Sequence, residues 1–224
     1  MGVTPDAQDR LSQLRARVRS GGAVDGLFGL GCLVAAMWIV QAVNALDDQK
    51  LSLYDGLFAR SISHLWGIVT CPFLHASWAH LEGNTLPLLF LGALVAIRGL
   101  RHFSAITIIV IVVGGLGTWL ISPSTSNGFR VDTVGASGLI FGYAGYLLAR
   151  GVIDHRLVDL ALAAVVTVLW GAALLSSLLP HQGVSWQGHL CGGLTGIWLA
   201  WMMSDRRARR RGRRGASAAV PTPP

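Results

Sequence analysis

The feature that most constrains this chain is a series of six long apolar runs, of which the first two are separated by a longer loop, residues 47–75, called the first loop below. The runs extend over about residues 24–46, 76–97, 103–121, 134–149, 157–179 and 186–203. A hydrocarbon core of roughly 30 Å is crossed by about 20 helical residues, and lipid offers no partner to unpaired backbone groups. The sequence is also 52% apolar, with a mean hydropathy of +0.54. It therefore predicts an all-α polytopic membrane protein built as a six-helix transmembrane bundle.

Positive charge is distributed unevenly between the two sides of such a bundle. If the N-terminus is cytoplasmic, 15 of the 18 lysine and arginine residues fall on the cytoplasmic side, and only Lys50, Arg60 and Arg130 lie outside. Lysine and arginine are retained in short cytoplasmic loops during membrane insertion. We therefore expect a multi-pass protein of the cell membrane with both termini in the cytoplasm.

The sequence divides into three parts. Residues 1–23 are a basic cytoplasmic segment, either a short helix on the membrane surface or a disordered arm. Residues 24–204 form the membrane domain, and residues 205–224 form a basic tail that we expect to be disordered. The net charge of +7 comes largely from these ends. It favours contact with membrane lipid headgroups and does not favour nucleic acid as a partner.

The motif with most chemical content is Gly135-Ala136-Ser137-Gly138, at the start of the fourth apolar run. A polar group without a partner is expensive at this depth, so a serine here needs an explanation. We interpret Ser137 as a nucleophile. This interpretation requires a base and oxyanion donors from other helices at the same depth.

Spans two, four and six run in the same direction, and each ends on a charged residue. These residues are Arg98, Arg150 and Asp205, and we expect them to mark the cytoplasmic surface. At about 1.5 Å per helical residue, the heights above that surface are ~20 Å for Ser137, ~21 Å for Asn84, ~24 Å for His189 and ~27 Å for His80. All four then lie in the outer third of the bilayer core. Small residues that allow close helix approach recur in spans four and six, at Gly138, Gly142, Gly188, Gly192 and Gly196.

These residues suggest a specific chemistry. Ser137 attacks a carbonyl carbon, and His189 accepts its proton and later protonates the leaving amine. His80, Asn84 and the backbone N–H of Ser137 hold the oxyanion, since His80 and Asn84 are four residues apart on one helix face. No acidic residue is placed beside His189, so we predict a dyad whose imidazole is oriented by packing against Phe141. No cofactor is expected.

Other interpretations of the same residues remain. Serine, asparagine and histidine often join membrane helices by hydrogen bonds without any catalytic role. A transporter or channel is disfavoured because few charged residues lie within the spans. A zinc protease using His75, His80 and Glu82 is disfavoured because residues five apart on a helix point ~140° apart and no H-E-x-x-H occurs. The third run, 103–121, is predicted to be a plain scaffold helix.

The ordered set of motifs resembles the rhomboid family of intramembrane serine proteases. The resemblance rests on H-x-x-x-N in span two, G-x-S-G in span four and H-x-x-G-x-x-x-G in span six. It also includes residues of the first loop, namely Trp66, Thr70 and Phe73-Leu74-His75. G-x-S-G alone is a weak signal, whereas the three motifs in order on alternate spans are a strong one.

The resemblance implies a six-helix rhomboid core that cleaves transmembrane protein substrates near the outer face. It assigns catalysis to Ser137 and His189, assisted by His80 and Asn84. It also implies a hydrated cavity open to the outside, which agrees with polar residues at the start of span six, at His181, Gln182, Ser185 and Gln187. The alternative within this family is an inactive relative that binds membrane clients. Such relatives typically lose the serine or the histidine, and this chain keeps both.

Two positions depart from the family pattern. The family often has an arginine after the loop tryptophan and a glutamate at the end of span two, where this chain has Gly67 and Ala96. Both family residues are associated with holding the first loop in place. The resemblance therefore does not say how this loop is anchored here.

Overall fold

The computed structural model describes residues 5–126, 129–130, 132–154, 157–176, 178–179 and 185–218 of the chain. Its long helical segments are α1 (Pro5–Leu46), α4 (Trp78–Ala96), α5 (Leu100–Ile109), η3 (Val110–Gly114), α6 (Gly115–Ile121), α7 (Ser137–Asp154), α8 (Leu157–Ser176) and α9 (Trp186–Ala218). The short elements are α2 (Lys50–Tyr54), β1 (Leu57–Phe58), η1 (Ile62–His64), α3 (Gly67–Thr70), η2 (Cys71–Phe73), β2 (Thr125–Ser126), β3 (Phe129–Arg130) and β4 (Asp132–Thr133).

The prediction of an all-α polytopic membrane protein is confirmed. Within the described ranges, three segments are long and apolar enough to cross a membrane: Gly22–Leu46, Trp78–Ala96 and Leu100–Ile121. A shorter apolar helix covers Ser137–Ile153. The helices correspond in order to the apolar runs of the sequence, and the third run is covered by α5, η3 and α6 together.

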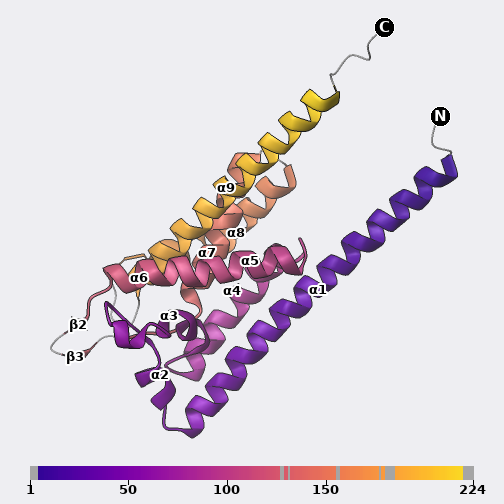
Figure 1. Cartoon of the computed structure of the whole chain (residues 1–224). Coiled ribbons are helices and arrows are strands. Elements are labelled where there is room, and N and C mark those ends of the chain that lie inside the picture. Colours follow the sequence, from indigo (N-terminus) through magenta and orange to yellow (C-terminus); the bar gives the residue numbers. More distant parts are fainter. Residues whose placement is uncertain are drawn as a thin grey trace.

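The helices are arranged so that both chain ends project on the same side (Figure 1). The short elements α2, α3, β2 and β3 gather at the opposite end. The continuous segment α5–η3–α6 crosses between α1 and α4 on one side and α9 on the other. The two-stranded pairing β1–β4 joins the first loop to the chain just before α7, with Leu57 opposite Thr133 and Phe58 opposite Asp132.

Helix α7 lies at the centre of the bundle. Its residues from Leu139 to Leu147 are buried without interruption, and Tyr143 and Tyr146 are fully buried. Their hydroxyls have partners, because the Tyr143 hydroxyl lies 2.6 Å from Thr107 Oγ1 and the Tyr146 hydroxyl accepts from Arg150 Nη1 at 2.9 Å. Buried hydroxyls need such partners. The helix is therefore enclosed by protein along most of its length.

Glycines bring α7 and α9 into backbone contact. A Cβ atom on Gly192 would lie 2.0 Å from the Gly138 carbonyl oxygen, and one on Gly196 would lie 2.0 Å from the Gly142 carbonyl oxygen. No side chain fits at such distances, so glycine is required at both positions. This contact confirms the close approach that the spacing of small residues predicts.

Several predicted boundaries were wrong. Span four begins as a helix at Ser137, because Gly135 has φ +112 and breaks the regular backbone before it. We expected Arg150 to mark a membrane surface, but α7 continues to Asp154 and Arg150 is only 2% exposed. The third run is not a plain helix, since Val110–Gly114 forms a π-helical turn.

The terminal segments are helical as far as the structure describes them. We expected residues 205–224 to be disordered, whereas the backbone of α9 is helical to Ala218. Likewise the basic N-terminal segment continues without a break into the first span, because α1 is one helix from Pro5. The remainder of the predicted tail, residues 219–224, lies outside the described residues.

Candidate active site

Ser137 is the first residue of α7 and follows a turn that other parts of the chain hold in place. The Gly135 N–H donates to the Cys71 carbonyl oxygen at 2.8 Å, and the Ala136 N–H donates to His75 Nε2 at 3.4 Å. The first N–H groups of a helix have no intrahelical acceptor and carry the positive end of its dipole. The N–H of Ser137 therefore lies where a developing anion is stabilised.

His75 is a residue of this site for which the sequence predicted no catalytic or positioning role. Its side chain is fully buried in the loop before α4, and its carbonyl oxygen accepts from Asn44 Nδ2 at 3.2 Å. Because Nε2 accepts the Ala136 N–H, the ring is neutral with its proton on Nδ1. Burial, with a smaller contribution from His80, lowers the pKa of His75 to about 4. In the sequence, only its place in the first-loop motif Phe73-Leu74-His75 pointed to a role for His75 in this site.

The side chains of His80 and Asn84 converge on the serine turn from α4. A Cβ atom on Gly135 would lie 2.7 Å from His80 Nε2 and 3.4 Å from Asn84 Nδ2. Among the described residues, Asn84 Nδ2 has no hydrogen-bond partner although it is buried. A buried donor left without an acceptor costs about 1–3 kcal/mol. Such a donor beside the turn is suited to hydrogen-bond to an oxygen atom of a bound molecule.

His189 lies in the first turn of α9 with its ring flat against Phe141. The ring centroids are 4.2 Å apart and the planes differ by 2°. His189 is only 5% exposed. Phe141 is four residues after Ser137 on α7, so the two side chains share one face of the helix. The packing of the imidazole against Phe141 that the sequence predicts is therefore present, on the face that carries the serine.

A cavity adjoins Ser137 between α7, α9 and the loops. Its volume is about 40 Å³, which accommodates about three water molecules at 10–15 Å³ each. Four hydroxyl-bearing residues line it, namely Thr118, Thr133, Ser137 and Ser185, and Thr133 Oγ1 donates to Ser185 Oγ at 3.4 Å. The rest of the lining consists mainly of residues from the first loop, the π-helical turn and the glycines of α9, including Leu57, Cys71, Pro72, Val110, Ile111, Gly114, Gly188 and Gly192.

The π-helical turn and the first loop were not predicted as parts of this site. Gly114 in the turn packs closely on α9, since a Cβ atom there would lie 3.3 Å from Gly192 Cα. A π-helical turn inside an α-helix is frequently found at functional sites. The adjacent pair Gly114-Gly115 was the only signal of it in the sequence, because hydropathy alone does not distinguish a π-helix from an α-helix.

The remaining polar residues named from the sequence are two histidines near the site, Glu82, and the polar residues before α9. We expected His75 and His80 to point apart, but their ring centroids are 5.0 Å apart in an edge-to-face contact. The helical spacing argument failed because α4 begins only at Trp78, so His75 lies in the loop before it. Glu82 is exposed. His181 and Gln182, expected to line a hydrated cavity, lie outside the described residues.

Comparison with known proteins identifies the family. Residues 63–206 match the rhomboid domain model. An uncharacterized protein of Mycobacterium tuberculosis (strain ATCC 25618 / H37Rv) is 39% identical over 193 residues, which cover 84% of this chain and 80% of that protein. RHOMBOID-like protein 1 of Arabidopsis thaliana is 30% identical over 166 residues, 73% of this chain and 41% of that protein.

A third relative has a name that refers to an activity. The putative rhomboid protease YdcA of Bacillus subtilis (strain 168) is 27% identical over 146 residues, which cover 65% of this chain and 70% of that protein. The rhomboid domain match covers more than half of the chain, and it includes His80, Asn84, Ser137 and His189. This chain therefore belongs to the rhomboid family of membrane proteins.

Proposed function

We propose that this protein is an intramembrane serine endopeptidase that hydrolyses peptide bonds of transmembrane proteins through a dyad of Ser137 and His189. One observation carries the proposal most directly: the imidazole of His189 is stacked flat on Phe141, one helical turn from Ser137 and on the same face of α7. The rhomboid family membership supports the same chemistry.

The proposed reaction proceeds in two stages. The Ser137 hydroxyl oxygen attacks the scissile carbonyl carbon while the imidazole takes its proton, and the imidazolium then protonates the leaving amine. A water molecule, for which the cavity beside Ser137 has room, attacks the acyl ester with the imidazole again as base. Throughout, the unpartnered Nδ2 of Asn84, the side chain of His80 and the N–H of Ser137 donate to the oxyanion.

The proposed setting is the cell membrane with both termini in the cytoplasm and the serine turn toward the outer face. The membrane domain is residues 24–204, and its substrates are single-pass or polytopic membrane proteins cut near their outer boundary. A transmembrane helix must open locally before an enzyme reaches its backbone, because every backbone group in lipid is paired. We therefore expect substrates with a small residue and helix-weakening residues near that boundary.

The test uses the purified full chain in liposomes with a transmembrane substrate of that kind. Ser137→Ala and His189→Ala should each abolish cleavage, and Ser137→Ala should also abolish labelling by a fluorophosphonate. Asn84→Ala should reduce the rate by about 10² to 10³, the range measured for loss of one oxyanion donor. Retained cleavage in Ser137→Ala or His189→Ala would refute the proposed chemistry. Substrate binding without cleavage by the wild-type protein would instead support a client-binding role.

A further inference from the structure

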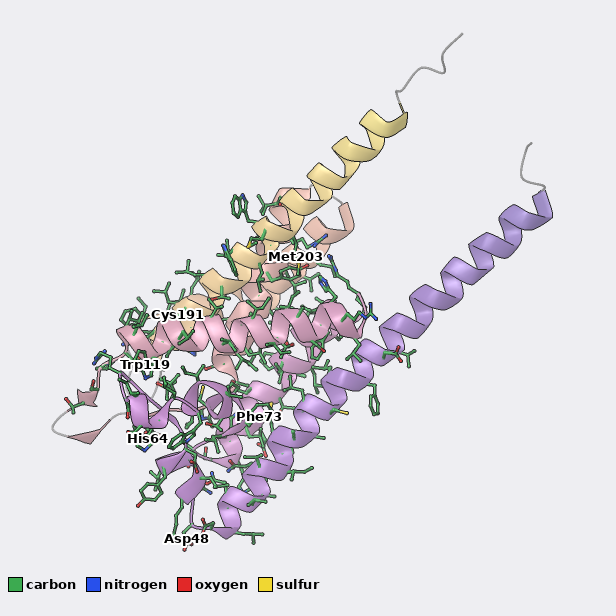
Figure 2. The ribbon with its side chains drawn as sticks, in the orientation of Figure 1. Asp48, His64, Phe73, Trp119, Cys191 and Met203 are labelled. Carbon is green, nitrogen blue, oxygen red and sulfur yellow. The ribbon has the colours of Figure 1, made fainter. Side chains whose placement is uncertain are left out.

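Residues 59–61 of the first loop are hydrogen-bonded to the end of α6. Arg60 donates its backbone N–H to the Trp119 carbonyl oxygen at 3.1 Å, and Trp119 Nε1 donates back to the Ser61 carbonyl oxygen at 3.3 Å. Ser124 Oγ donates to the Ala59 carbonyl oxygen at 3.5 Å. Figure 2 shows Trp119 at the end of the α6 segment nearest the loop that carries His64.

The side chain of Arg60 strengthens this junction. Its Nη1 donates to the Leu120 carbonyl oxygen at 3.0 Å and to the Ser122 carbonyl oxygen at 2.7 Å, and its Nη2 donates to Ser124 Oγ. The last carbonyls of a helix lack intrahelical partners and carry the negative end of its dipole. A planar guanidinium with donors in a fork reaches several such acceptors at once, which an ammonium group does not.

The backbone of Arg60 is in an unusual conformation. Its φ is +56, in the left-handed region that costs about 1–2 kcal/mol for a residue with a side chain. Such a residue persists where its surroundings determine the backbone, and these positions cluster at functional sites. The hydrogen bonds of Arg60 to the end of α6 supply those surroundings.

The same loop segment also holds the chain that enters the serine turn. Leu57 and Phe58 of β1 pair with Thr133 and Asp132 of β4, and β4 ends four residues before Ser137. Residues 57–61 therefore fasten both ends of the connection between α6 and α7. Further along the loop, the Cys71 carbonyl oxygen accepts the Gly135 N–H. A displacement of the loop would be transmitted directly to the serine turn.

The loop is closed by a backbone contact that leaves no room for a side chain. A Cβ atom on Gly67 would lie 2.4 Å from the Gly56 carbonyl oxygen and 2.8 Å from Leu57 Cα. Gly67 therefore packs directly against the backbone at the start of β1, but it has no charged group that could anchor the loop. Among the described residues of this loop, Arg60 is the cation that reaches another spanning segment.

We infer that Arg60 is a positioning residue for Ser137, which anchors the first loop to α6 and so fixes the turn that begins α7. The inference rests on the proposed protease function. The simpler reading is that Arg60 only caps α6, which would affect stability and nothing else. The two readings differ in what happens to the serine turn while the protein remains folded.

The experiment compares Arg60→Gly, Arg60→Lys and the wild-type full chain at a temperature well below unfolding. Arg60→Gly removes the guanidinium and its hydrogen bonds but permits the left-handed backbone, so the variant adds no backbone strain at this position. We expect kcat to fall about 10-fold with KM unchanged, equivalent to about 1.4 kcal/mol of transition-state stabilisation. Arg60→Lys should recover part of this, because one ammonium donor still reaches the carbonyls.

A second readout needs no catalytic activity. Hydrogen–deuterium exchange at the amides of Gly135 and Ala136 should become about 10-fold faster in Arg60→Gly, because the anchored turn opens more often. The matched control is Lys50→Ala in the same loop, whose ion pair with Asp47 is half exposed on both sides and contributes little. It should match the wild-type protein in kcat and exchange.

The outcomes separate the two proposals. A lower unfolding temperature in Arg60→Gly with unchanged kcat and unchanged exchange overturns the positioning role and leaves a helix cap. Faster exchange with lower kcat supports it. If the wild-type protein neither cleaves nor reacts with a fluorophosphonate, the proposed protease function fails, and the exchange measurement still decides whether Arg60 anchors the serine turn.

Discussion

At the scale of single residues, the site depends on rings and amides that are held before any substrate arrives. The imidazole of His189 lies flat against the ring of Phe141, which supplies a surface that fixes its plane. Aromatic pairs of this kind contribute about 0.5–1.5 kcal/mol beyond their buried area. The orientation of the imidazole is therefore expected to depend on the shape of residue 141 as well as on its hydrophobicity.

The role of this stack can be tested by Phe141→Leu. Leucine fills much of the space but offers no flat face, so we expect kcat/KM for the substrate to fall about 10-fold. The control is Phe103→Leu, which removes another buried ring, one that packs on Tyr143 at 6.1 Å. It should lower the unfolding temperature without this loss of rate. Equal rates of cleavage in the two variants would contradict an orienting role for Phe141.

His75 predicts a pH dependence of stability. Burial lowers its pKa from 6.5 to about 4, so between these values the unfolded chain binds a proton that the folded chain does not. Stability from this group is complete above pH 6.5 and is lost as the pH falls toward 4, with a slope of up to about 1.4 kcal/mol per pH unit.

The measurement is the thermal unfolding of the full chain in detergent between pH 4 and pH 7. His75→Gln keeps an acceptor for the Ala136 N–H but does not titrate, so its unfolding temperature should change less over this range. At neutral pH the variant should be less stable by about 1–3 kcal/mol, because the flexible amide replaces a ring in a fully buried site. The same pH slope in both proteins would show that His75 is not the group responsible.

At the scale of elements, the backbone contact between α7 and α9 sets the distance between the helix that carries Ser137 and the helix that carries His189. Gly192→Ala would place a methyl group 2.0 Å from the Gly138 carbonyl oxygen, so α9 would have to move away from α7. Overpacking of this kind costs about 1–3 kcal/mol, and more where backbone blocks the relief. We expect a lower unfolding temperature and strongly reduced cleavage.

A glycine in open space provides the control for this substitution. Gly83 lies on α4 beside Asn84, and a Cβ atom there would have nothing within 4 Å. Gly83→Ala should preserve cleavage and raise helix stability by up to about 1 kcal/mol, because alanine is the better helix former. Thermal unfolding and cleavage assays on both variants test the expectation, and a tolerated Gly192→Ala would argue against backbone contact at this site.

The structure shows how the first loop is held in place, which the sequence did not predict. Gly67 and Ala96 replace two family residues associated with holding this loop. In the structure Gly67 packs against the Gly56 backbone, and Trp66 Nε1 donates to Asp55 Oδ1 at 3.2 Å while Thr70 Oγ1 donates to the Asp55 carbonyl oxygen at 2.6 Å. The loop thus has its own internal contacts in addition to those of Arg60.

At the scale of the whole molecule, the asymmetry of lysine and arginine predicts the orientation in the membrane. In a variant whose cysteines are replaced, Ser63→Cys in the exposed first loop should react with a membrane-impermeant maleimide on intact cells. Ser217→Cys near the C-terminus should react only after the cells are permeabilised. The opposite labelling pattern would reverse the proposed topology and place the serine turn toward the cytoplasm.

The arrangement of both chain ends on one side (Figure 1) agrees with an even number of spans. The sequence was sufficient for this level of the fold, because lipid permits only helices with internally paired backbones and hydropathy marks where they occur. The sequence also predicted a site of Ser137, His189, His80 and Asn84, and the structure places His80 and Asn84 beside Gly135, and His189 against Phe141. Their catalytic roles stay predictions.

The sequence by itself determined which segments are helices, and it predicted which polar residues lie at similar depths. Only the tertiary structure decided that His75 and the Cys71 carbonyl hold the serine turn, that a π-helical turn lines the cavity, and that Arg60 joins the first loop to α6. The physical reason is that helical periodicity and hydropathy are local properties of the chain. The contacts of an irregular loop depend on which distant backbone it meets, and no periodic pattern in the sequence records that.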